Sequence, residues 1–375
     1  MILLALIPLF LYMLILFYFS IGYRRLSIFK GCENTQGSRF SILIPFRNER
    51  EHLPALLQSL ALLNYPKNNF EIWMIDDDSS DDSVAMIRAF ISENADLQMH
   101  LINNERKTNS AKKDAILSAL ELSNFDWIMT TDADCLLPEN WLQLFDQAIK
   151  KHKPVLLAAP VMYSKIEQTL LDQTQFFEFL SLQIITMGAF GLGKPFMCNG
   201  ANLCYQKTTF SSLKGFEGNE DFAGGDDLFL LEKMTEHFPE RVHFIKHNDC
   251  LVQTNTENSW SSFFSQRIRW AAKSGGYRQI IGKLTGLIVF SCNLTLIVLV
   301  LISVFYPETW GLALLGFFLK LLTDLALLMN GKTLFKKPIS LFYFFVTSLI
   351  YPFLNVSIGC RSLFGFTWKE RRYQK

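Results

Sequence analysis

Short apolar runs alternate with segments of helical periodicity between residues 38 and 130, and much longer apolar runs stand at both ends of the chain. In the segment 49–62, for example, four leucines recur at a spacing that puts them on one helix face. The predicted strands are 41–45, 70–75, 101–102 and 127–130, and the predicted helices are 49–62, 82–93 and 110–122. This alternation predicts an α/β domain over 38–275 with a mostly parallel sheet, whose ligands collect beyond the carboxyl ends of its strands.

The first 21 residues carry almost no charge and are followed by Arg24, Arg25 and Lys30. Roughly 20 apolar residues span a bilayer, so this segment is long enough to cross. A cleaved signal peptide would place basic residues before its apolar run and a small-residue cleavage site after it, and the sequence shows neither. We therefore predict a retained anchor at 1–23, with the chain from residue 24 onward in the cytoplasm.

The C-terminal part of the chain, 285–360, is predicted to be a membrane region of two or three apolar segments. The apolar runs are 285–306, 309–329 and 339–360. The first two predict a hairpin. The third either crosses the bilayer and leaves the basic tail 361–375 outside, against the positive-inside tendency, or is a re-entrant or interfacial segment with Pro352 in its middle.

Composition narrows the classes of function. The 375-residue chain is 50% hydrophobic, and its 36 Lys and Arg nearly balance its 35 Asp and Glu. This balance provides no field that would attract nucleic acid, so we expect no nucleic-acid partner. Seven cysteines occur without a CxxC pair, which favours buried thiols in a reducing compartment over a disulfide framework.

A run of acidic residues follows the predicted strand 70–75 directly. Asp76 and Asp77, at the strand exit, are placed to accept hydrogen bonds from a nucleobase or ribose. Asp81 and Asp82 are expected to cap the helix that follows, which requires no function.

A second acidic pair, Asp132 and Asp134, follows the predicted strand 127–130. Two carboxylates at i and i+2 on a turn can direct oxygens at one hard divalent cation. Mg²⁺ or Mn²⁺ prefers such ligands and shares its coordination with substrate phosphates. A DxD sequence in a loop is often only solvated surface, but here apolar residues flank the pair on both sides. The pattern therefore predicts a site for Mg²⁺ or Mn²⁺.

Two glycines precede Asp226 and Asp227 at the start of a predicted helix. Glycine lets the backbone approach a ligand or turn sharply. A carboxylate at such a helix start is suited to accept a proton from a sugar hydroxyl. Helix capping accounts for Asp226, and we predict that Asp227 is the catalytic base.

Gln266, Arg269 and Trp270 stand at i, i+3 and i+4 within the predicted helix 259–275, so they share one face. A guanidinium can clamp a diphosphate, and an indole offers a stacking platform for a sugar ring. The aromatic and basic residues around them also predict a helix at the membrane interface, and both interpretations can hold. Lys112 either reaches a phosphate or belongs to a solvated helix face.

Taken together, these residues give the chain a resemblance to membrane-anchored family 2 glycosyltransferases of the GT-A fold. This group holds cellulose, hyaluronan and chitin synthases and ceramide glucosyltransferase-like enzymes. The resemblance covers roughly residues 38–275 and departs from the family pattern where Asp78 and Ala111 replace glycines and Asp226 replaces a glutamate. The matching positions are the first-strand segment 41–49, Asp77, Asp132 and Asp134, the acceptor-side segment 199–202, Asp227, and Gln266, Arg269 and Trp270 of a QxxRW motif.

The resemblance implies a Rossmann-like cytoplasmic GT-A domain flanked by transmembrane helices, and an inverting, metal-dependent hexosyl transfer. Asp227 would deprotonate the acceptor hydroxyl, and the cation would neutralise the leaving diphosphate. An aromatic segment, with Phe176, Phe177 and Phe190, would line the acceptor path or form a core helix. The implied nucleotide-binding residues are Pro45, Arg47, Glu49, Asp77, Lys112 and Asp132, the implied metal ligands are Asp132 and Asp134, and the implied acceptor or diphosphate residues are Asp226, Gln266, Arg269 and Trp270.

The implied partners are a nucleotide-sugar donor, by default UDP-linked, a lipid or glycan acceptor, and the lipids of the cell membrane. Single transfer to a lipid or membrane-proximal acceptor is favoured over processive polysaccharide synthesis, because two or three C-terminal segments are few for threading a polymer. A hypothesis of another class is a non-catalytic membrane component of an envelope assembly or export system, with proteins of that pathway as partners. A transporter is disfavoured, since Asp324 alone stands clearly as an ionisable group within the apolar segments.

Overall fold

The computed structural model describes residues 6–31, 37–218, 224–273, 279–364, 366–368 and 371–373. The chain divides into two compact units. The sheet unit comprises Ser27–Ser164 and Met197–Asn255, and the helical unit comprises Met1–Leu26, Lys165–Phe196 and Thr256–Lys375. The span 38–275, expected to be one domain, is therefore shared between the two units.

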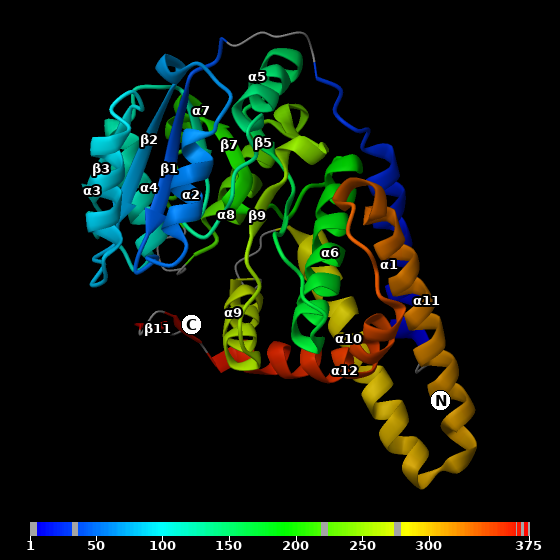
Figure 1. The fold of residues 1–375 in the computed structure, drawn as a ribbon. Coiled ribbons are helices and arrows are strands. Elements are labelled where there is room, and N and C mark those ends of the chain that lie inside the picture. The colour runs from blue at the N-terminus through cyan, green and yellow to red at the C-terminus, as the bar shows by residue number, and fades with distance from the viewer. Residues whose placement is uncertain are drawn as a thin grey trace. The chain divides into compact units, whose positions relative to one another are not determined.

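The sheet unit is built on a seven-stranded sheet with the order β3-β2-β1-β4-β7-β5-β8 (Figure 1). Strands β1 to β4 pair in parallel, whereas β7 runs antiparallel between β4 and β5. The prediction of a mostly parallel sheet is thus confirmed. The strands are β1 Phe40–Phe46, β2 Phe70–Asp76, β3 Met99–Asn103, β4 Trp127–Thr130, β5 Leu156–Ala158, β7 Leu203–Gln206 and β8 Val242–Phe244.

Helices of the sheet unit follow the strands, as the sequence predicts. Because β2 and β3 lie on one side of β1 and β4 on the other, right-handed crossovers place α2 and α3 on one face of the sheet and α4 on the opposite face. The strand order reverses between β1 and β4, which is where ligands of such sheets bind. The helices are α2 Leu53–Ala61, α3 Ser83–Glu93, α4 Ala111–Leu122, α5 Trp141–His152, α7 Lys207–Ser212 and α8 Asp226–His237.

A small two-stranded sheet adjoins the loop that follows β4. It pairs β6 (Val161–Tyr163) in parallel with β9 (Val252–Thr254). Leu136 forms an isolated bridge to Gln253. This bridge brings the end of β9 beside the segment that carries Asp132 and Asp134, a contact between residues more than one hundred positions apart.

Asn202 links three segments of the chain in the core of the sheet unit. Its side chain is fully buried: the amide nitrogen donates to the carbonyls of Pro160 and Cys250, each at 2.7 Å, and the amide oxygen accepts from the Trp141 indole at 2.9 Å. The segment 199–202 was expected to face an acceptor. The Asn202 side chain instead joins three parts of the unit.

Replacing Asn202 with Ala should therefore destabilise the sheet unit. The Trp141 indole and the Cys250 carbonyl would lose the partner that Asn202 provides, and the Pro160 carbonyl would keep only its bond from the Val252 amide. We expect this loss to cost about 3 kcal/mol of unfolding free energy. The midpoint of thermal unfolding in detergent measures the effect. Asn255→Ala is the matched control, because Asn255 is exposed and accepts one hydrogen bond, from Ser164 at 3.1 Å. Equal midpoints for the two variants would contradict the assigned role.

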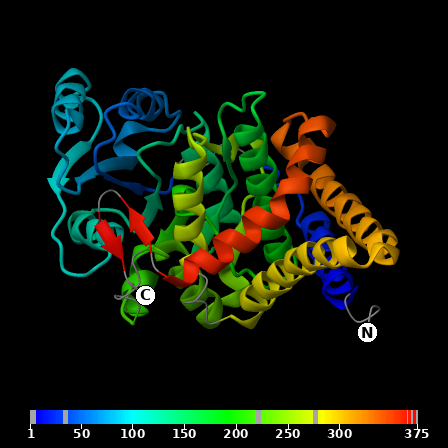
Figure 2. The ribbon, with the colours of Figure 1, turned by 90° about the horizontal axis from the view of Figure 1, so that it is seen from below.

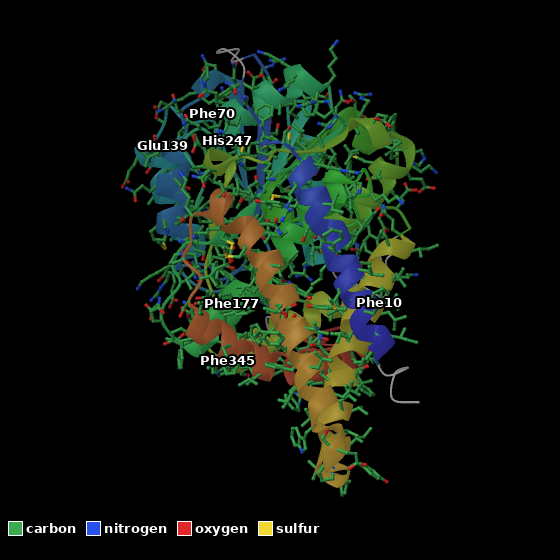
Figure 3. All side chains as sticks on the ribbon, turned by 90° about the vertical axis from the view of Figure 1, so that its right-hand side faces the viewer. Phe10, Phe70, Glu139, Phe177, His247 and Phe345 are labelled. Carbon is green, nitrogen blue, oxygen red and sulfur yellow. The ribbon has the colours of Figure 1, made fainter. Side chains whose placement is uncertain are left out.

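The helical unit contains long apolar helices. Among the described residues, four are long and apolar enough to cross a membrane: Ile7–Arg25, Ile280–Phe305, Pro307–Phe335 and Leu341–Phe364. Their outer side chains are exposed; Phe10 on α1 and Phe345 on α12, for example, are 60% and 48% exposed (Figure 3). The elements of the unit are α1 Ile7–Arg25, α6 Leu170–Gly191, α9 Trp260–Lys273, α10 Ile280–Phe305, α11 Trp310–Phe335, α12 Leu341–Arg361, β10 Phe366–Trp368 and β11 Arg371–Tyr373.

Helix α6 is the centre of the helical unit and packs against α1, α11 and α12. Phe176, Phe177 and Phe190 lie on it and are at most 9% exposed. Of the two interpretations of this aromatic segment, the structure supports the core helix. These three rings are packing residues.

The third C-terminal apolar run forms one continuous helix, α12, with Pro352 inside it. Figure 1 shows α12 running crosswise to the long α10–α11 hairpin, and Figure 2 shows it beside α10 from below. Asn293 of α10 donates to Asn355 of α12 at 3.4 Å. Helix α12 therefore crosses the α10–α11 hairpin and does not run alongside it as a third helix of the same bundle would.

A buried ion pair lies inside the apolar helices. Lys320 Nζ contacts Asp324 Oδ2 at 2.6 Å, and the Tyr12 hydroxyl donates to Asp324 Oδ1 at 2.6 Å. Lys320 is only 2% exposed. Asp324 is therefore not an isolated ionisable group: its charge is compensated within the unit, which ties α1 to α11.

Candidate active site

The sheet unit gathers most of the predicted site residues at one edge. Strands β1, β2 and β4 end there, and the N-terminus of α8 lies beside Lys112. The predicted residues found at this edge are Pro45, Arg47, Glu49, Asp76, Asp77, Lys112, Asp132, Asp134, Asp226 and Asp227. Gln266, Arg269 and Trp270 belong to α9 of the helical unit.

Asp77 is held by side chains that the sequence analysis did not single out. Arg106 donates from Nε and Nη2 to the two carboxylate oxygens, each at 2.7 Å, and Asn104 donates to Oδ1 at 2.8 Å. The Asp77 side chain is only 8% exposed. Such a bidentate pair is geometrically specific, so Asp77 presents a fixed carboxylate at the end of β2.

The turn after Asp77 adopts a backbone shape that favours glycine. Asp78, which replaces the family glycine, has a φ of 66°, a region that aspartate tolerates better than most residues. Asp76 accepts from the Ser79 amide at 3.0 Å and closes the turn. Asp81 accepts from the Ser83 amide at 3.0 Å, so it caps α3 as predicted. Asp82 occupies the N-cap position without a capping hydrogen bond.

The segment after β1 packs on this turn. Arg47 donates to the carbonyl of Asp77 at 3.3 Å, and the Glu49 amide donates to Ser83 at 2.9 Å. The Glu49 carboxylate also contacts His52 Nδ1 at 2.9 Å, which raises the pKa of His52. Arg47 and Glu49 thus hold the segment after β1 against the turn after β2 and the start of α3 through backbone and side-chain contacts.

Lys112 joins the two acidic clusters. Its Nζ lies 2.6 Å from Asp132 Oδ1 and 3.6 Å from Asp226 Oδ2. Burial alone would lower the pKa of the Lys112 ammonium, but the charges of Asp132 and Asp226 outweigh burial and raise it. Lys112 therefore stays a cation and is not part of a solvated helix face.

Asp134 faces a different set of neighbours from Asp132. Thr254 of β9 donates to its Oδ2 at 3.1 Å. Burial, together with the negative charges of Asp132 and Glu49, raises the pKa of the Asp134 carboxyl. A carboxylate whose ionised form is disfavoured in this way gains from a nearby cation.

Asp227 is oriented by two backbone amides. Gly200 donates to its Oδ2 at 3.0 Å, and Leu228 donates to its Oδ1 at 2.9 Å. Gly200 is itself held by Thr130 of β4, whose hydroxyl donates to the Gly200 carbonyl at 2.7 Å. A Cβ at Gly200 would meet Asp226 Oδ2 at 3.2 Å, so glycine leaves room for the Lys112–Asp226 contact.

The role predicted for Asp226 as a helix cap is wrong. Gly225, in the left-handed region, is the N-cap of α8, and Asp226 is the first residue of the helix. Asp226 is buried and directed to Lys112 instead. The contact of Asp226 with Lys112, a residue distant in the sequence, determines its role, and the local sequence pattern does not show this contact.

The QxxRW residues lie on α9 of the helical unit. Gln266 donates to Glu257 at 2.7 Å and accepts from Arg267. Trp270 packs near Phe179 of α6, with ring centroids 6.0 Å apart. Gln266 is thus engaged with its own unit through both ends of its amide.

Two family models match the chain. Residues 127–355, more than half of the chain, match the glycosyl transferase family group 2, and residues 41–209 match glycosyl transferase family 2. The matches run from the sheet through the apolar helices, and their overlap contains both members of the DxD pair.

Named relatives and a solved structure agree with these models. The chain is 25% identical over 254 residues to the beta-monoglucosyldiacylglycerol synthase of Trichormus variabilis, covering 64% of this chain and 49% of that protein. It is 23% identical over 273 residues to the poly-beta-1,6-N-acetyl-D-glucosamine synthase of Staphylococcus epidermidis, covering 71% and 62%. The matched part of the chain spans about half the length of the Trichormus variabilis synthase and of two other curated relatives.

The mannosyltransferase PcManGT of Pyrobaculum calidifontis, solved with GDP-Man and Mn²⁺, aligns with a TM-score of 0.60 at 16% identity. The alignment covers 96% of this chain and 97% of that one, which shows a shared GT-A fold. With the family models, the mixed sheet and the apolar helices, it follows that this chain belongs to the glycosyl transferase family group 2.

Proposed function

We propose that this chain is an inverting, metal-dependent hexosyltransferase that moves a sugar from a nucleotide-sugar, UDP-linked by default, to a lipid or membrane-proximal acceptor. The observation that carries the proposal is the meeting of Asp77, Lys112, Asp132 and Asp227 at one edge of the sheet. Four charged side chains from separate elements are suited to bind a ligand that carries both a nucleoside and a diphosphate. The family membership supports the same chemistry.

The nucleoside side of the proposed site is the end of β1 and β2. The carboxylate of Asp77, fixed by Arg106, can accept from the ring N–H of a base or from ribose. Lys112, with its charge retained beside Asp132, is placed to meet the diphosphate. One solved structure of the same fold agrees with such a donor, since PcManGT was solved with GDP-Man.

Asp132 and Asp134 fit a divalent cation of the Mg²⁺ or Mn²⁺ type. Both offer hard carboxylate oxygens, and burial, with the charges of Asp132 and Glu49, raises the pKa of Asp134, so that a bound cation would favour its ionised form. No cluster of three or more His, Cys, Asp or Glu gathers among the described residues. A two-carboxylate set suits a cation that takes its other ligands from substrate phosphates. Such a cation would supply neutralisation of the diphosphate charge.

Asp227 is the proposed base. Its carboxylate, aimed by the amides of Gly200 and Leu228, accepts the proton of the acceptor hydroxyl. The acceptor oxygen then forms a bond to the anomeric carbon as the bond from that carbon to the diphosphate oxygen breaks. Attack opposite the leaving group inverts the configuration. Lys112 is the proposed partner of the negative charge on the departing diphosphate.

The proposed topology places the sheet unit in the cytoplasm. Tyr12 contacts Asp324 and Arg24 contacts Asn330, so α1 and α11 run in the same direction and end on the same side of the bilayer. Arg24 and Arg25 mark that side as cytoplasmic. We propose that α12 lies at the interface, which would keep Arg361 at its end on this side as well, in agreement with the positive-inside tendency.

The test is nucleoside diphosphate release by the full chain in lipid nanodiscs, across a panel of UDP- and GDP-sugars with a diacylglycerol or polyprenyl-phosphate acceptor. We expect release with one donor, a fall of at least about 10-fold with chelator, and recovery with Mn²⁺ or Mg²⁺. Product length separates single transfer from polymerisation. No release from any donor with metal and both acceptors present would refute the proposal and favour a non-catalytic membrane component.

A further inference from the structure

A polar network ties α6 to α9 within the helical unit. Gln175 of α6 is fully buried; its amide nitrogen donates to the Glu257 carbonyl at 3.0 Å, and its amide oxygen accepts from the Glu257 amide at 2.8 Å. The Glu257 carboxylate in turn accepts from Gln266 at 2.7 Å. The segment before α9 and the motif residue Gln266 are thereby held in one arrangement.

Arg267, between the motif positions, is the most buried charged residue of this network. Its Nε donates to Glu178 of α6, and the Arg267 and Glu178 side chains are 2% and 12% exposed. Its Nη1 donates to the amide oxygen of Gln266. The QxxRW pattern does not include Arg267, so the motif by itself assigns it no role. A buried guanidinium needs such partners, because an unpaired buried charge is costly.

Trp270 is held by the same pair of residues. The Arg267 guanidinium lies 4.3 Å from the Trp270 ring centroid and 4.6 Å from that of Phe263, so it sits against two aromatic rings. Phe179, which follows Glu178 on α6, also contacts the indole. The ring surface that Arg267 covers is closed to a sugar, so any stacking on Trp270 uses the remaining surface.

We infer that the buried Glu178–Arg267 ion pair is a positioning device that sets the orientation of Trp270 and Gln266 for the acceptor. The inference rests on the proposed function and on the acceptor role that the family resemblance implies for Trp270. Glu178 fixes the guanidinium, and the guanidinium fixes both the indole and the amide. Neither Glu178 nor Arg267 needs to touch the substrate.

A double-mutant cycle with Glu178→Gln, Arg267→Met and the double variant tests the pair in nanodiscs. Each single variant is expected to lower kcat/KM for the acceptor by about 10- to 100-fold, because small misplacements of a binding group are costly. The KM for the nucleotide-sugar should change by less than about 2-fold, since Asp77 and Lys112, the residues proposed to bind the nucleoside and the diphosphate, lie in the sheet unit and are unchanged. The double variant should be no worse than either single one, because both buried charges leave together. Arg267→Lys, which keeps the charge, should recover part of the loss.

A readout independent of turnover is quenching of Trp270 fluorescence by acrylamide, isolated among the seven tryptophans by subtracting Trp270→Phe in each background. We expect stronger quenching of Trp270 in both single variants. Glu167→Gln is the matched control, because Glu167 and Lys165 form an exposed pair in the same unit, and it should match the wild type.

Lower thermal stability with unchanged Trp270 quenching and unchanged acceptor kcat/KM would show a purely structural pair and overturn the inference. Equal changes in donor and acceptor KM would overturn it as well. Failure of the proposed function is a different result: the wild type would release no nucleoside diphosphate, while the quenching comparison would still report on the orientation of Trp270.

Discussion

Asp227→Asn is expected to lower sugar transfer by about 10²- to 10⁴-fold, the range in which general bases contribute. The asparagine side chain has nearly the same shape, and its oxygen can still accept from the Gly200 amide, but it cannot take the proton of the acceptor hydroxyl. Nucleotide affinity should stay near the wild-type value, because the nucleoside and diphosphate residues are untouched. Steady-state diphosphate release and calorimetric titration with the nucleoside diphosphate measure the two quantities.

Two further variants serve as controls for this prediction. Asp172→Asn changes another first-turn carboxylate, on α6, and should leave turnover unchanged. Asp226→Asn changes the neighbouring carboxylate, whose Oδ2 lies 3.6 Å from Lys112 Nζ. If Asp226→Asn abolished transfer while Asp227→Asn kept it within about 3-fold of wild type, the base would be Asp226.

Gly188→Leu is expected to destabilise the helical unit by about 3 kcal/mol or more, since its backbone has no room for a side chain. A Cβ at Gly188 would lie 2.3 Å from the carbonyl oxygen of Phe19, and a Cβ at Gly22 would lie 2.1 Å from that of Gly188. Helices α1 and α6 thus meet backbone to backbone, as helices do in membranes where small residues line the contact. The midpoint of thermal unfolding in detergent measures the loss.

Gly286→Leu is the matched control. Gly286 lies in α10, and no neighbouring atom lies within 4 Å of its Cβ position. The substitution exchanges glycine for a better helix former and should leave the midpoint unchanged or raised. If the Gly188→Leu and Gly286→Leu variants had the same midpoint of thermal unfolding, the close contact between α1 and α6 would contribute nothing to stability.

Elements with strong periodicity were predictable, and elements without it were not. The expected strand 41–45 lies within β1, the expected helix 110–122 matches α4, and the run 285–306 lies in α10 up to its last residue, Phe305. The antiparallel strand β7 and the short β9 were not predicted. Their position depends on pairing with strands far away in the chain, such as β4 with β7.

The candidate site likewise contains some residues that the sequence could predict and others that it could not. Asp77, Asp132 and Asp227 were identifiable because each follows an apolar strand or begins a helix. Arg106 was not, since its partner Asp77 lies 29 residues away and no local pattern links them. The capping role predicted for Asp226 failed for the same reason: Lys112, more than one hundred positions away, decides what that carboxylate contacts.

By itself the sequence determined that this chain has an α/β domain, apolar segments long enough for a membrane, and carboxylates at strand and helix ends, because periodicity and residue type are local properties. The tertiary structure alone decided that Lys112 joins two acidic clusters, that Gly22 and Gly188 bring two helices into backbone contact, and that Arg267 is buried against Glu178. Those are contacts between distant positions. Their free energies depend on distance and burial, which only the folded chain defines.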